Sequence, residues 1–293
     1  MKRLSSIGEF GFIETLKSKT KTSKDTVCGI GDDCAVIKYT GNEYLLYTTD
    51  MIIEDVHFKR SSSTPEDIGH KALAVNASDI AACAGIPRWA VISGGFPGSL
   101  SVSYCTGIYK GIKALAKKIH VDIVGGDTNK SKKIIVSIAL IGTVKKENLL
   151  LRSGAKDKDV IVLSGRLKIK PDHLKFMPKI NEASFITKHL KPTSMIDISD
   201  GFLSDLMHIL KDSKKAALIY ESLIPNIRKL SYKKLLNEGE QFQLLFTMPK
   251  TKLNCLPKDF YPIGEIKQGA PRIVYINRQG KRESLLPKGY RHF

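Results

Sequence analysis

Acidic side chains stand out in this sequence because the chain is otherwise strongly basic. It has 47 Lys and Arg residues against 29 Asp and Glu residues, a formal net charge of +18. Grouped carboxylates repel one another unless a cation holds them, and Mg²⁺ prefers such oxygen ligands. A Mg²⁺ site in turn favours a phosphate-bearing substrate. Seven aspartates lie where an apolar run meets a Gly- or Ser-rich turn, or within a small-residue helix: Asp32, Asp33, Asp50, Asp79, Asp127, Asp197 and Asp200.

Residues next to these aspartates fit the same chemistry. Thr48 and Thr49 directly precede Asp50 and offer hydroxyl and carbonyl oxygens as hard ligands. Asn76 lies three positions before Asp79, so both side chains can face one site from a helix. Any single aspartate can instead be a helix cap or a turn former. The seven together favour metal binding over that alternative.

Two common phosphate-binding loops do not account for the pattern. The P-loop motif G-x-x-x-x-G-K-[ST] does not occur. Gly29 and Gly31 are spaced like the start of a dinucleotide-binding fingerprint, but Asp32 and Asp33 follow at once. Two carboxylates there would repel a pyrophosphate unless a metal intervenes.

Composition sets limits on the class of protein. At 293 residues, with 42% hydrophobic and 26% charged residues, the chain is expected to form a globular protein of two domains. No apolar run reaches the roughly 18 residues of a membrane span, and the N-terminus lacks a secretory signal, so we expect a cytoplasmic location and no membrane partner. The five cysteines form no C-x-x-C pair and are expected to be reduced. The lysines are spread without interleaved aromatics, which argues against a nucleic-acid partner.

Strands and helices must bring the acidic residues together. The sequence predicts a strand over residues 44–49 that ends at Asp50, and a helix that begins at Thr64 and stops before Gly85. A further helix over 99–120, a strand over 121–124 that runs into a turn at Gly125 and Gly126, and a strand over 133–144 complete the first half. The polar stretch 145–159 marks a domain boundary. Strands over 160–163, 194–198, 241–247, 261–266 and 272–276, with a helix from 201 to 210, make up the second half. We therefore predict an α+β protein of two α/β domains, residues 1–148 and 149–293, with mixed sheets and helices packed on one face.

Five ordered motifs then resemble thiamine-monophosphate kinase, a family of the aminoimidazole ribonucleotide synthetase superfamily. The resemblance covers nearly the whole chain and includes a Gly289–Phe293 terminus of the family type. The motifs are Gly31-Asp32-Asp33-Cys34-Ala35, Thr48-Thr49-Asp50-Met51 with Glu54-Asp55-Val56-His57-Phe58, Ala74-Val75-Asn76-Ala77-Ser78-Asp79-Ile80, Gly125-Gly126-Asp127-Thr128 and Asp197-Ile198-Ser199-Asp200-Gly201.

This resemblance implies an activity: transfer of the γ-phosphoryl group of ATP to thiamine monophosphate, giving thiamine diphosphate by direct in-line, Mg²⁺-assisted transfer. It also implies a homodimer, and it implies no catalytic residue beyond the metal ligands. The implied Mg²⁺ ligands are Asp33, Thr48, Thr49, Asp50, Asp79, Asp127, Asp197 and Asp200. The implied ATP contacts are Tyr109, Gly126, Asp127, Arg152 and Ser199. The implied substrate contacts are His57, Glu240 and Tyr290.

The sequence also departs from the family pattern. Where the family has G-G-E-D-Y-E-L, residues 238–244 read E-G-E-Q-F-Q-L, so Glu240 remains while Gln241, Phe242 and Gln243 replace an acid, a tyrosine and a second acid. The segment 164–191 is short and poor in glycine. Two alternatives therefore stay open: another ATP-using enzyme of the same superfamily, or a non-catalytic basic binding protein with a degenerate kinase fold.

Overall fold

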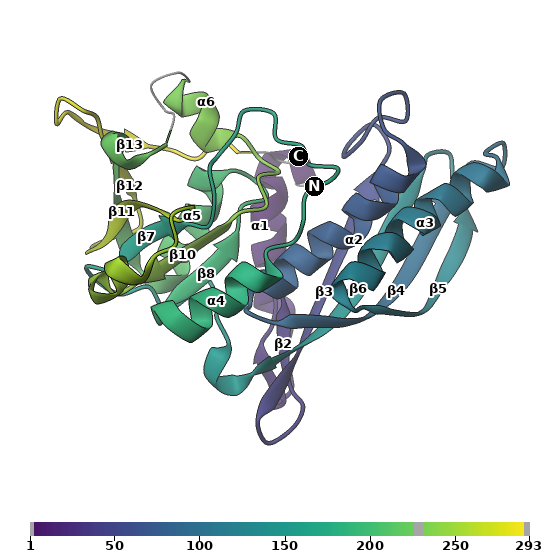
Figure 1. Cartoon of the computed structure of the whole chain (residues 1–293), viewed down its shortest axis with the longest axis horizontal. Coiled ribbons are helices and arrows are strands. Elements are labelled where there is room, and N and C mark those ends of the chain that lie inside the picture. Colours follow the sequence, from purple (N-terminus) through teal and green to yellow (C-terminus); the bar gives the residue numbers. More distant parts are fainter. Residues whose placement is uncertain (1–2, 226–230, 290–293) are drawn as a thin grey trace.

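Two β-sheets divide the chain between them in a computed structural model that describes residues 3–225 and 231–289 (Figure 1). The six-stranded first sheet has the order β1-β2-β3-β6-β4-β5, and the seven-stranded second sheet has the order β13-β12-β9-β11-β7-β10-β8. The first sheet contains β1 (Thr26–Cys28), β2 (Ala35–Lys38), β3 (Glu43–Ile53), β4 (Ile86–Phe96), β5 (Asp122–Lys130) and β6 (Ile135–Lys145). The second contains β7 (Val160–Leu163), β8 (Ser194–Asp197), β9 (Lys215–Tyr220), β10 (Leu244–Met248), β11 (Tyr261–Gln268), β12 (Ile273–Ile276) and β13 (Arg282–Leu285).

Both sheets are mixed, as predicted. Strands β4 and β5 pair in parallel in the first sheet, and β9 and β12 pair in parallel in the second, while the other neighbouring strands in these sheets pair antiparallel. The helices are α1 (Leu4–Lys19), α2 (Pro65–Ala82), α3 (Val102–Ile119), α4 (Ile180–Leu190), α5 (Phe202–Ser213) and α6 (Tyr232–Asn237), with short 3₁₀ helices η1 (Lys146–Asn148), η2 (Glu221–Leu223) and η4 (Lys250–Cys255). In Figure 1, α2 and α3 lie together over one face of the first sheet. The prediction of an α+β protein with mixed sheets is therefore confirmed. Helices pack on one face of the first sheet as predicted, whereas alternate residues of β7 in the second sheet pack with α4 on one side and with α5 on the other.

Helix α2 is the element that joins the two halves. The side chain of Thr64 accepts a hydrogen bond from the Asp67 backbone N–H at 3.1 Å, and Pro65 occupies the first turn, as the sequence predicts. Small side chains such as Ala74, Ala77 and Ala81 let the helix be buried on several sides. It packs on β3 and β6 of the first sheet and also on β8 and α4 of the second half. Side chains on α2 can therefore meet residues from both sheets.

Glycines set the close packing of α2 on α3. A Cβ atom at Gly69 would lie 1.9 Å from the Ile108 carbonyl oxygen, and one at Gly111 would lie 1.9 Å from the Glu66 carbonyl oxygen. Any larger residue would push the helices apart. The two glycines thus fix the depth at which α2 sits between its neighbours.

Three predicted strand limits were wrong by three residues or more. Strand β3 continues to Ile53, so Asp50 lies inside the strand and pairs with Ile138 of β6. Strand β5 continues to Lys130, so Gly125, Gly126 and Asp127 are strand residues and not a turn. Strand β10 begins at Leu244, three residues later than predicted. In the first two cases pairing with a long neighbouring strand outweighs the local turn tendency of Gly and Asp.

The predicted boundary near residue 148 falls between the last strand of the first sheet and the first strand of the second. The division into domains at that residue stays a prediction.

All five cysteines are free thiols, and Cys34 and Cys83 are buried. Within residues 3–225 and 231–289, the longest helices are too polar or too short to cross a membrane.

Candidate active site

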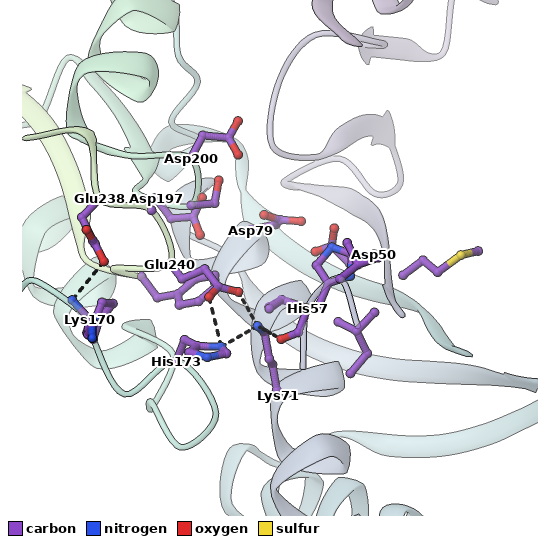
Figure 2. A pocket seen from close by; sticks show the side chains of 18 of the residues that line it. Asp50, His57, Lys71, Asp79, Lys170, His173, Asp197, Asp200, Glu238 and Glu240 are labelled. Carbon is purple, nitrogen blue, oxygen red and sulfur yellow. Dashed lines mark hydrogen bonds and ion pairs between the residues drawn. The ribbon is translucent and has the colours of Figure 1, made fainter. Parts of the chain in front are cut away.

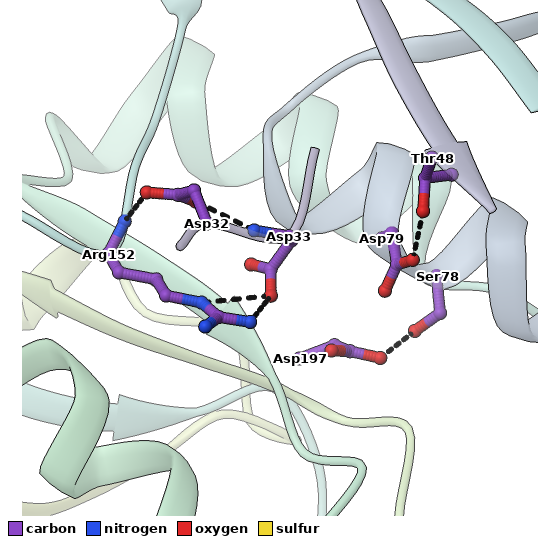
Figure 3. A network of polar contacts seen from close by, with 7 residues as sticks. All are labelled: Asp32, Asp33, Thr48, Ser78, Asp79, Arg152 and Asp197. Atoms are coloured by element: carbon purple, nitrogen blue, oxygen red, sulfur yellow. Dashed lines mark hydrogen bonds and ion pairs between the residues drawn. The ribbon is translucent and has the colours of Figure 1, made fainter. Parts of the chain in front are cut away.

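Three of the predicted acidic residues meet between the two sheets (Figure 3). Asp33 precedes β2, Asp79 lies on α2, and Asp197 ends β8 in the second half of the chain. One carboxylate oxygen from each lies within 4.8 Å of the other two. The convergence that the sequence could only suggest is therefore present, and residues far apart in the chain create it.

Arg152 fixes one side of this aspartate cluster. Its Nε and Nη2 atoms donate to Oδ1 of Asp33 at 3.1 and 2.6 Å. The neighbouring Asp32 accepts from the backbone N–H groups of Arg152 and Asp33, both at 3.0 Å. The other oxygen of Asp33, Oδ2, is buried and has no hydrogen-bond partner among the described residues. Burying such an atom is costly unless something binds it.

Hydroxyl groups orient the two other acids. Thr48 of β3 donates to Oδ2 of Asp79 at 2.5 Å, and Ser78 of α2 donates to Oδ2 of Asp197 at 2.5 Å. Ser78 and Asp79 are adjacent on α2, so one helix supplies an acid and holds the acid that the second sheet supplies. The cluster is preorganised by contacts from both halves of the chain.

Burial makes the cluster electrostatically unfavourable when it is empty of cations. Burial first, and the neighbouring carboxylates next, raise the pKa of Asp50 to about 6, the pKa of Asp197 to about 8 and the pKa of Asp79 well above its usual value. Burial also raises the pKa of Asp33, although Arg152 acts in the opposite direction. A divalent cation would bind the ionised form of these acids and offer the buried Oδ2 of Asp33 a partner. The donor set and the orphaned oxygen therefore fit a hard cation.

Asp50 and Thr49 lie on opposite faces of β3. Side chains alternate along a strand, so Thr48, Asp50 and Ile52 face α2, while Thr49 and Met51 face the other way. The Asp50 backbone N–H donates to Oδ1 of Asn76 on α2 at 3.0 Å. The structure thus brings Asp50 towards Asp79 and does not bring the Thr49 hydroxyl to the cluster.

Asp127 is also separated from the cluster. Asp127 of β5, Ser93 of β4, Ser137 of β6 and Met51 of β3 are paired with one another in turn across the sheet. Paired residues point to the same face, so the side chain of Asp127 lies on the face of Met51. Its strand is three positions from β3, or roughly 14 Å at the usual strand spacing. Asp127 is exposed, and its carboxylate accepts a hydrogen bond from Asn129. Gly126 is on the same edge strand, at a point where a Cβ atom would lie 1.9 Å from the Ile92 carbonyl oxygen.

Tyr109, the remaining predicted ATP contact of the first half, projects from α3 and is 42% exposed. The Lys113 ammonium lies over its ring, 5.3 Å from the ring centroid. Tyr109 does not line the cavity described next. The structure thus places Tyr109, Gly126 and Asp127 away from the three convergent aspartates of the same chain.

A cavity of about 630 Å³ opens beside the cluster (Figure 2). Residues from both halves line it, so it lies where the two sheets meet. Its acidic part includes Asp50, Asp79, Asp197 and Asp200, with Ser199 between the last two. Its other part includes His57, Lys71, Lys170, His173, Glu238 and Glu240. This size suits a small organic ligand rather than a macromolecule.

His57 reaches the cavity from the turn that follows β3. The Ile53 backbone N–H donates to Nδ1 of His57 at 3.0 Å, and the backbone N–H of His57 donates to the Ile53 carbonyl at 2.9 Å. Because Nδ1 accepts, a neutral His57 carries its proton on Nε2. The side chain is therefore fixed in the wall of the cavity, and its contact with the substrate stays a prediction.

The altered motif of residues 238–244 is well anchored. Glu240 and Phe242 have positive φ values of 55° and 48°, which non-glycine residues adopt infrequently. Their backbone N–H groups donate to the carbonyls of Ser199 and Ile198 at 2.6 and 2.8 Å. This strained backbone is what presents Glu240 to the cavity, and such strain is typical of functional sites. Tyr290, the last predicted substrate contact, lies outside the described residues.

The replacements in that motif have structural partners in the shortened segment. The Gln241 amide accepts from the Lys168 backbone N–H at 2.9 Å and donates to the Lys168 carbonyl at 2.6 Å. The Phe242 ring stacks on Phe176, with 3.9 Å between centroids and 4° between planes. The segment before α4 is therefore held against residues 241 and 242, where it forms one wall of the cavity.

Sequence reasoning missed Lys71 and His173. Lys71 has a side chain only 1% exposed, and its ammonium contacts the His57 carbonyl at 2.9 Å, Nδ1 of His173 at 2.6 Å and the Glu240 carboxylate. A signal was present, because a lysine inside the otherwise small and apolar run of α2 is unusual. His173 lies in the loop before α4, where the sequence gives no such signal.

The fold and site together define a class of protein. Residues 31–144 match the family model described as AIR synthase related protein, N-terminal domain. A structure of the hydrogenase maturation protein HypE in complex with ATP shares the fold, with a TM-score of 0.70 at 18% identity over 87% of this chain and 88% of that one. The region that contains most of the first sheet thus matches the AIR synthase-related N-terminal domain, and the two-sheet fold is shared with this HypE structure.

Full-length relatives narrow this to one family. The chain is 36% identical to the thiamine-monophosphate kinase of Aquifex aeolicus over 99% of this chain and all of that protein. It is 31% identical to that of Bacillus subtilis over 97% of this chain and 99% of that protein. A solved structure described as AaThiL complexed with AMPPCP and TMP has a TM-score of 0.86 at 33% identity, covering 100% of this chain and 99% of that one. The chain belongs to the thiamine-monophosphate kinase family.

Proposed function

We propose that the cavity beside the aspartate cluster is the active site for ATP-dependent phosphorylation of thiamine monophosphate. The chain is a kinase that transfers a phosphoryl group from ATP to thiamine monophosphate, giving thiamine diphosphate and ADP. The observation that carries the location is the convergence of Asp33, Asp79 and Asp197 next to a cavity of ligand size. The acidic end of that cavity would receive the phosphates, and the rings of the substrate would extend towards the other end.

Mg²⁺ is the cation that this proposal assigns to the cluster. Asp33, Asp79 and Asp197 would hold it, with Asp50 and Asp200 as further oxygen donors from the cavity wall. Bound Mg²⁺ supplies charge that offsets the repulsion between two anionic substrates and stabilises the transferring phosphoryl oxygens. The support is the orphaned Oδ2 of Asp33 and the raised pKa values of the surrounding acids.

The protein side chains have the task of positioning. The acceptor is a phosphate, which is already ionised near neutral pH, so direct in-line attack needs no strong general base. Ser199 lines the cavity beside the cluster and is our proposed nucleotide contact. Arg152 lies behind Asp33 and keeps its Oδ1 fixed, and a direct contact of Arg152 with ATP stays a prediction.

A homodimer is the proposed assembly, and the face of the first sheet that lies opposite α2 and α3 supports it (Figure 1). On this face Tyr47, Met51 and Val91 are 40%, 51% and 41% exposed, and Ile86 is 50% exposed. Helices α2 and α3 cover the opposite face (Figure 1). An exposed sheet face that carries several large apolar side chains is typical of an interface. A second copy packed there would bury these side chains.

The same face explains how Asp127 can serve the reaction. Asp127 shares it with Met51 and cannot reach the aspartates of its own chain. We infer that Asp127 contributes to the nucleotide site of a second copy across the proposed interface. This assignment makes the dimer part of the active site and gives it a functional test.

The experiment that tests the function uses purified protein with Mg-ATP and thiamine monophosphate, followed by separation of the thiamine phosphates. Thiamine diphosphate and ADP should appear in equal amounts, and thiamine should be a far poorer acceptor. Consumption of ATP without thiamine diphosphate would favour another ATP-using enzyme of the superfamily. The cytoplasmic location and the lack of a nucleic-acid partner stay predictions.

A further inference from the structure

A charged network lies on the opposite side of the cavity from Asp200 (Figure 2). Lys71 is its centre, and the three protons of its ammonium have three acceptors: the His57 carbonyl, Nδ1 of His173 and the Glu240 carboxylate. The side chain of Lys71 is 1% exposed, whereas that of Glu240 is 37% exposed. Lys71 is therefore buried behind Glu240, and Glu240 is the group that a ligand can reach.

The lysine also decides how His173 is protonated. Nδ1 of His173 lies 2.6 Å from the Lys71 ammonium and 3.1 Å from Oε2 of Glu240. An ammonium can only donate, so Nδ1 accepts from Lys71, and the imidazole is neutral with its proton on Nε2. Burial first, and Lys71 next, lower the pKa of His173, which agrees with this assignment.

We propose that Lys71 is a positioning residue that fixes Glu240 and His173 as an acceptor and donor pair for the aminopyrimidine ring of thiamine monophosphate. The inference rests on the proposed function and names the part of the substrate that this end of the cavity receives. The ring has an amino group that donates and ring nitrogens that accept. A carboxylate oxygen of Glu240 and the Nε2–H of His173 are complementary to them.

Charge balance favours this orientation over the reverse one. The Lys71 and Glu240 charges cancel, so this end of the cavity suits an uncharged ring. The thiazolium ring is a cation, which the neutral Lys71–Glu240 pair does not attract, whereas the acids at the other end of the cavity, Asp50 and Asp200, would attract it. The phosphate group then points to the aspartate cluster, where transfer occurs.

Backbone geometry supports a positioning role. Glu240 has a φ of 55° and is held by the Ser199 carbonyl from one side and by Lys71 from the other. Lys71 comes from α2, which also supplies Asp79. One helix thus sets both the phosphate end and the ring end of the cavity.

The first test is Lys71→Met, which keeps the length of the side chain and removes its charge. The KM for thiamine monophosphate should rise roughly 10- to 100-fold, by analogy with the loss of groups that orient metal ligands. The KM for ATP should change by less than about twofold, since ATP binds at the other end. Lys175→Met is the matched control, because Lys175 is 62% exposed and pairs with Asp67 outside the cavity. It should leave both constants unchanged.

A truncated substrate separates ring recognition from general damage. An N-methylthiazolium phosphate keeps the cation and phosphate of thiamine monophosphate and lacks the aminopyrimidine ring. Its affinity should be the same for the wild-type protein and for Lys71→Met. An equal loss for this probe and for thiamine monophosphate, or an unchanged KM for thiamine monophosphate, would overturn the proposal.

A double variant covers the case in which Lys71→Met deprives the Glu240 carboxylate of its buried cation and unfolds the protein. Lys71→Met with Glu240→Gln removes both charges and should restore the melting temperature. Its KM for thiamine monophosphate should stay high and be no higher than that of either single variant. If the double variant raised this KM by the product of the two single increases, or if it failed to fold, Lys71 would have a structural role alone. If wild-type protein makes no thiamine diphosphate, it is the proposed function that fails.

Discussion

Arg152 and Asp33 are joined through one carboxylate oxygen: Nε and Nη2 of the guanidinium both donate to Oδ1, at 3.1 and 2.6 Å. Oδ2 of Asp33 is left buried, with no hydrogen-bond partner among the described residues. The ion pair therefore fixes the carboxylate through Oδ1 and leaves Oδ2 available to another ligand. This division lets Asp33 tie the two halves of the chain together and still offer an oxygen to a cation.

Removing one acid from the cluster should separate stability from activity. Asp79→Asn keeps the shape of the side chain and removes a charge that burial and the neighbouring carboxylates make unfavourable. We expect the metal-free variant to melt at a higher temperature than the wild-type protein. Turnover should fall by at least about 100-fold, as when other groups that stabilise transferring charge are lost. Calorimetry and the thiamine diphosphate assay measure the two effects.

The control for that variant is Asp67→Asn, on the same helix but outside the cavity, where Asp67 pairs with the exposed Lys175. It should change turnover little. A variant Asp79→Asn that keeps near-normal turnover, or that is destabilised without metal, would argue against a strained acidic cluster.

Stability without metal should depend on pH through the same acids. The pKa of Asp197 is raised from 3.8 to about 8 in the folded protein. The folded state therefore holds more protons than the unfolded state between these values, and stability falls as the pH rises through about 8. Mg²⁺ requires the ionised acids, so its stabilising effect should be larger above about pH 8 than near pH 6. Melting curves with Mg²⁺ and with a chelator across this range provide the measurement, and a Mg²⁺ effect that shrinks at high pH would contradict it.

The two threonines of β3 offer a comparison within one strand. Thr48 donates to Asp79, whereas the Thr49 side chain faces away from the cluster. Thr48→Val should weaken Mg²⁺ binding about tenfold or more, by analogy with other groups that orient metal ligands. Thr49→Val keeps the backbone carbonyl and should have the smaller effect. Titration of Mg²⁺ in the kinetic assay measures the Mg²⁺ affinity of both variants. An equal loss of affinity in the two would mean that the face of β3 on which a threonine lies does not govern Mg²⁺ binding.

Mixing two inactive variants tests whether Asp127 acts across the dimer. Asp127→Asn and Asp50→Asn should each be nearly inactive alone. If Asp127 serves the second copy, a mixed dimer has one intact site, and subunit exchange at equal amounts should restore about a quarter of wild-type activity. Mixtures no more active than the separate variants would place both residues in one chain's site or exclude the dimer. Light scattering gives the assembly state of each sample.

The acids of the site could be identified from the sequence because they contrast with the residues next to them in the chain. Asp33, Asp79 and Asp197 each follow or interrupt an apolar run, and that contrast is visible without a structure. The face on which a residue lies is different, because it depends on strand length and register. Strands β3 and β5 run past Thr49 and Asp127, and pairing with β6 and β4 decides where their side chains point.

The ring end of the cavity was harder to predict for a related reason. Glu240 could be named from the family motif, but its partners come from α2 and from the loop before α4. Lys71 and His173 are 102 residues apart in the chain, and neither lies in a recognised motif. Only the packing of α2 between the two sheets brings them together.

The central claim is that Asp33, Asp79 and Asp197 hold the divalent cation of the reaction. Mn²⁺ can replace Mg²⁺ at oxygen sites and is visible by its anomalous scattering. Crystals grown with Mn²⁺ and a non-hydrolysable ATP analogue should show an anomalous peak bound by these three carboxylates, including Oδ2 of Asp33. No peak at the cluster, with Mn²⁺ bound elsewhere in a protein that still makes thiamine diphosphate, would contradict the account.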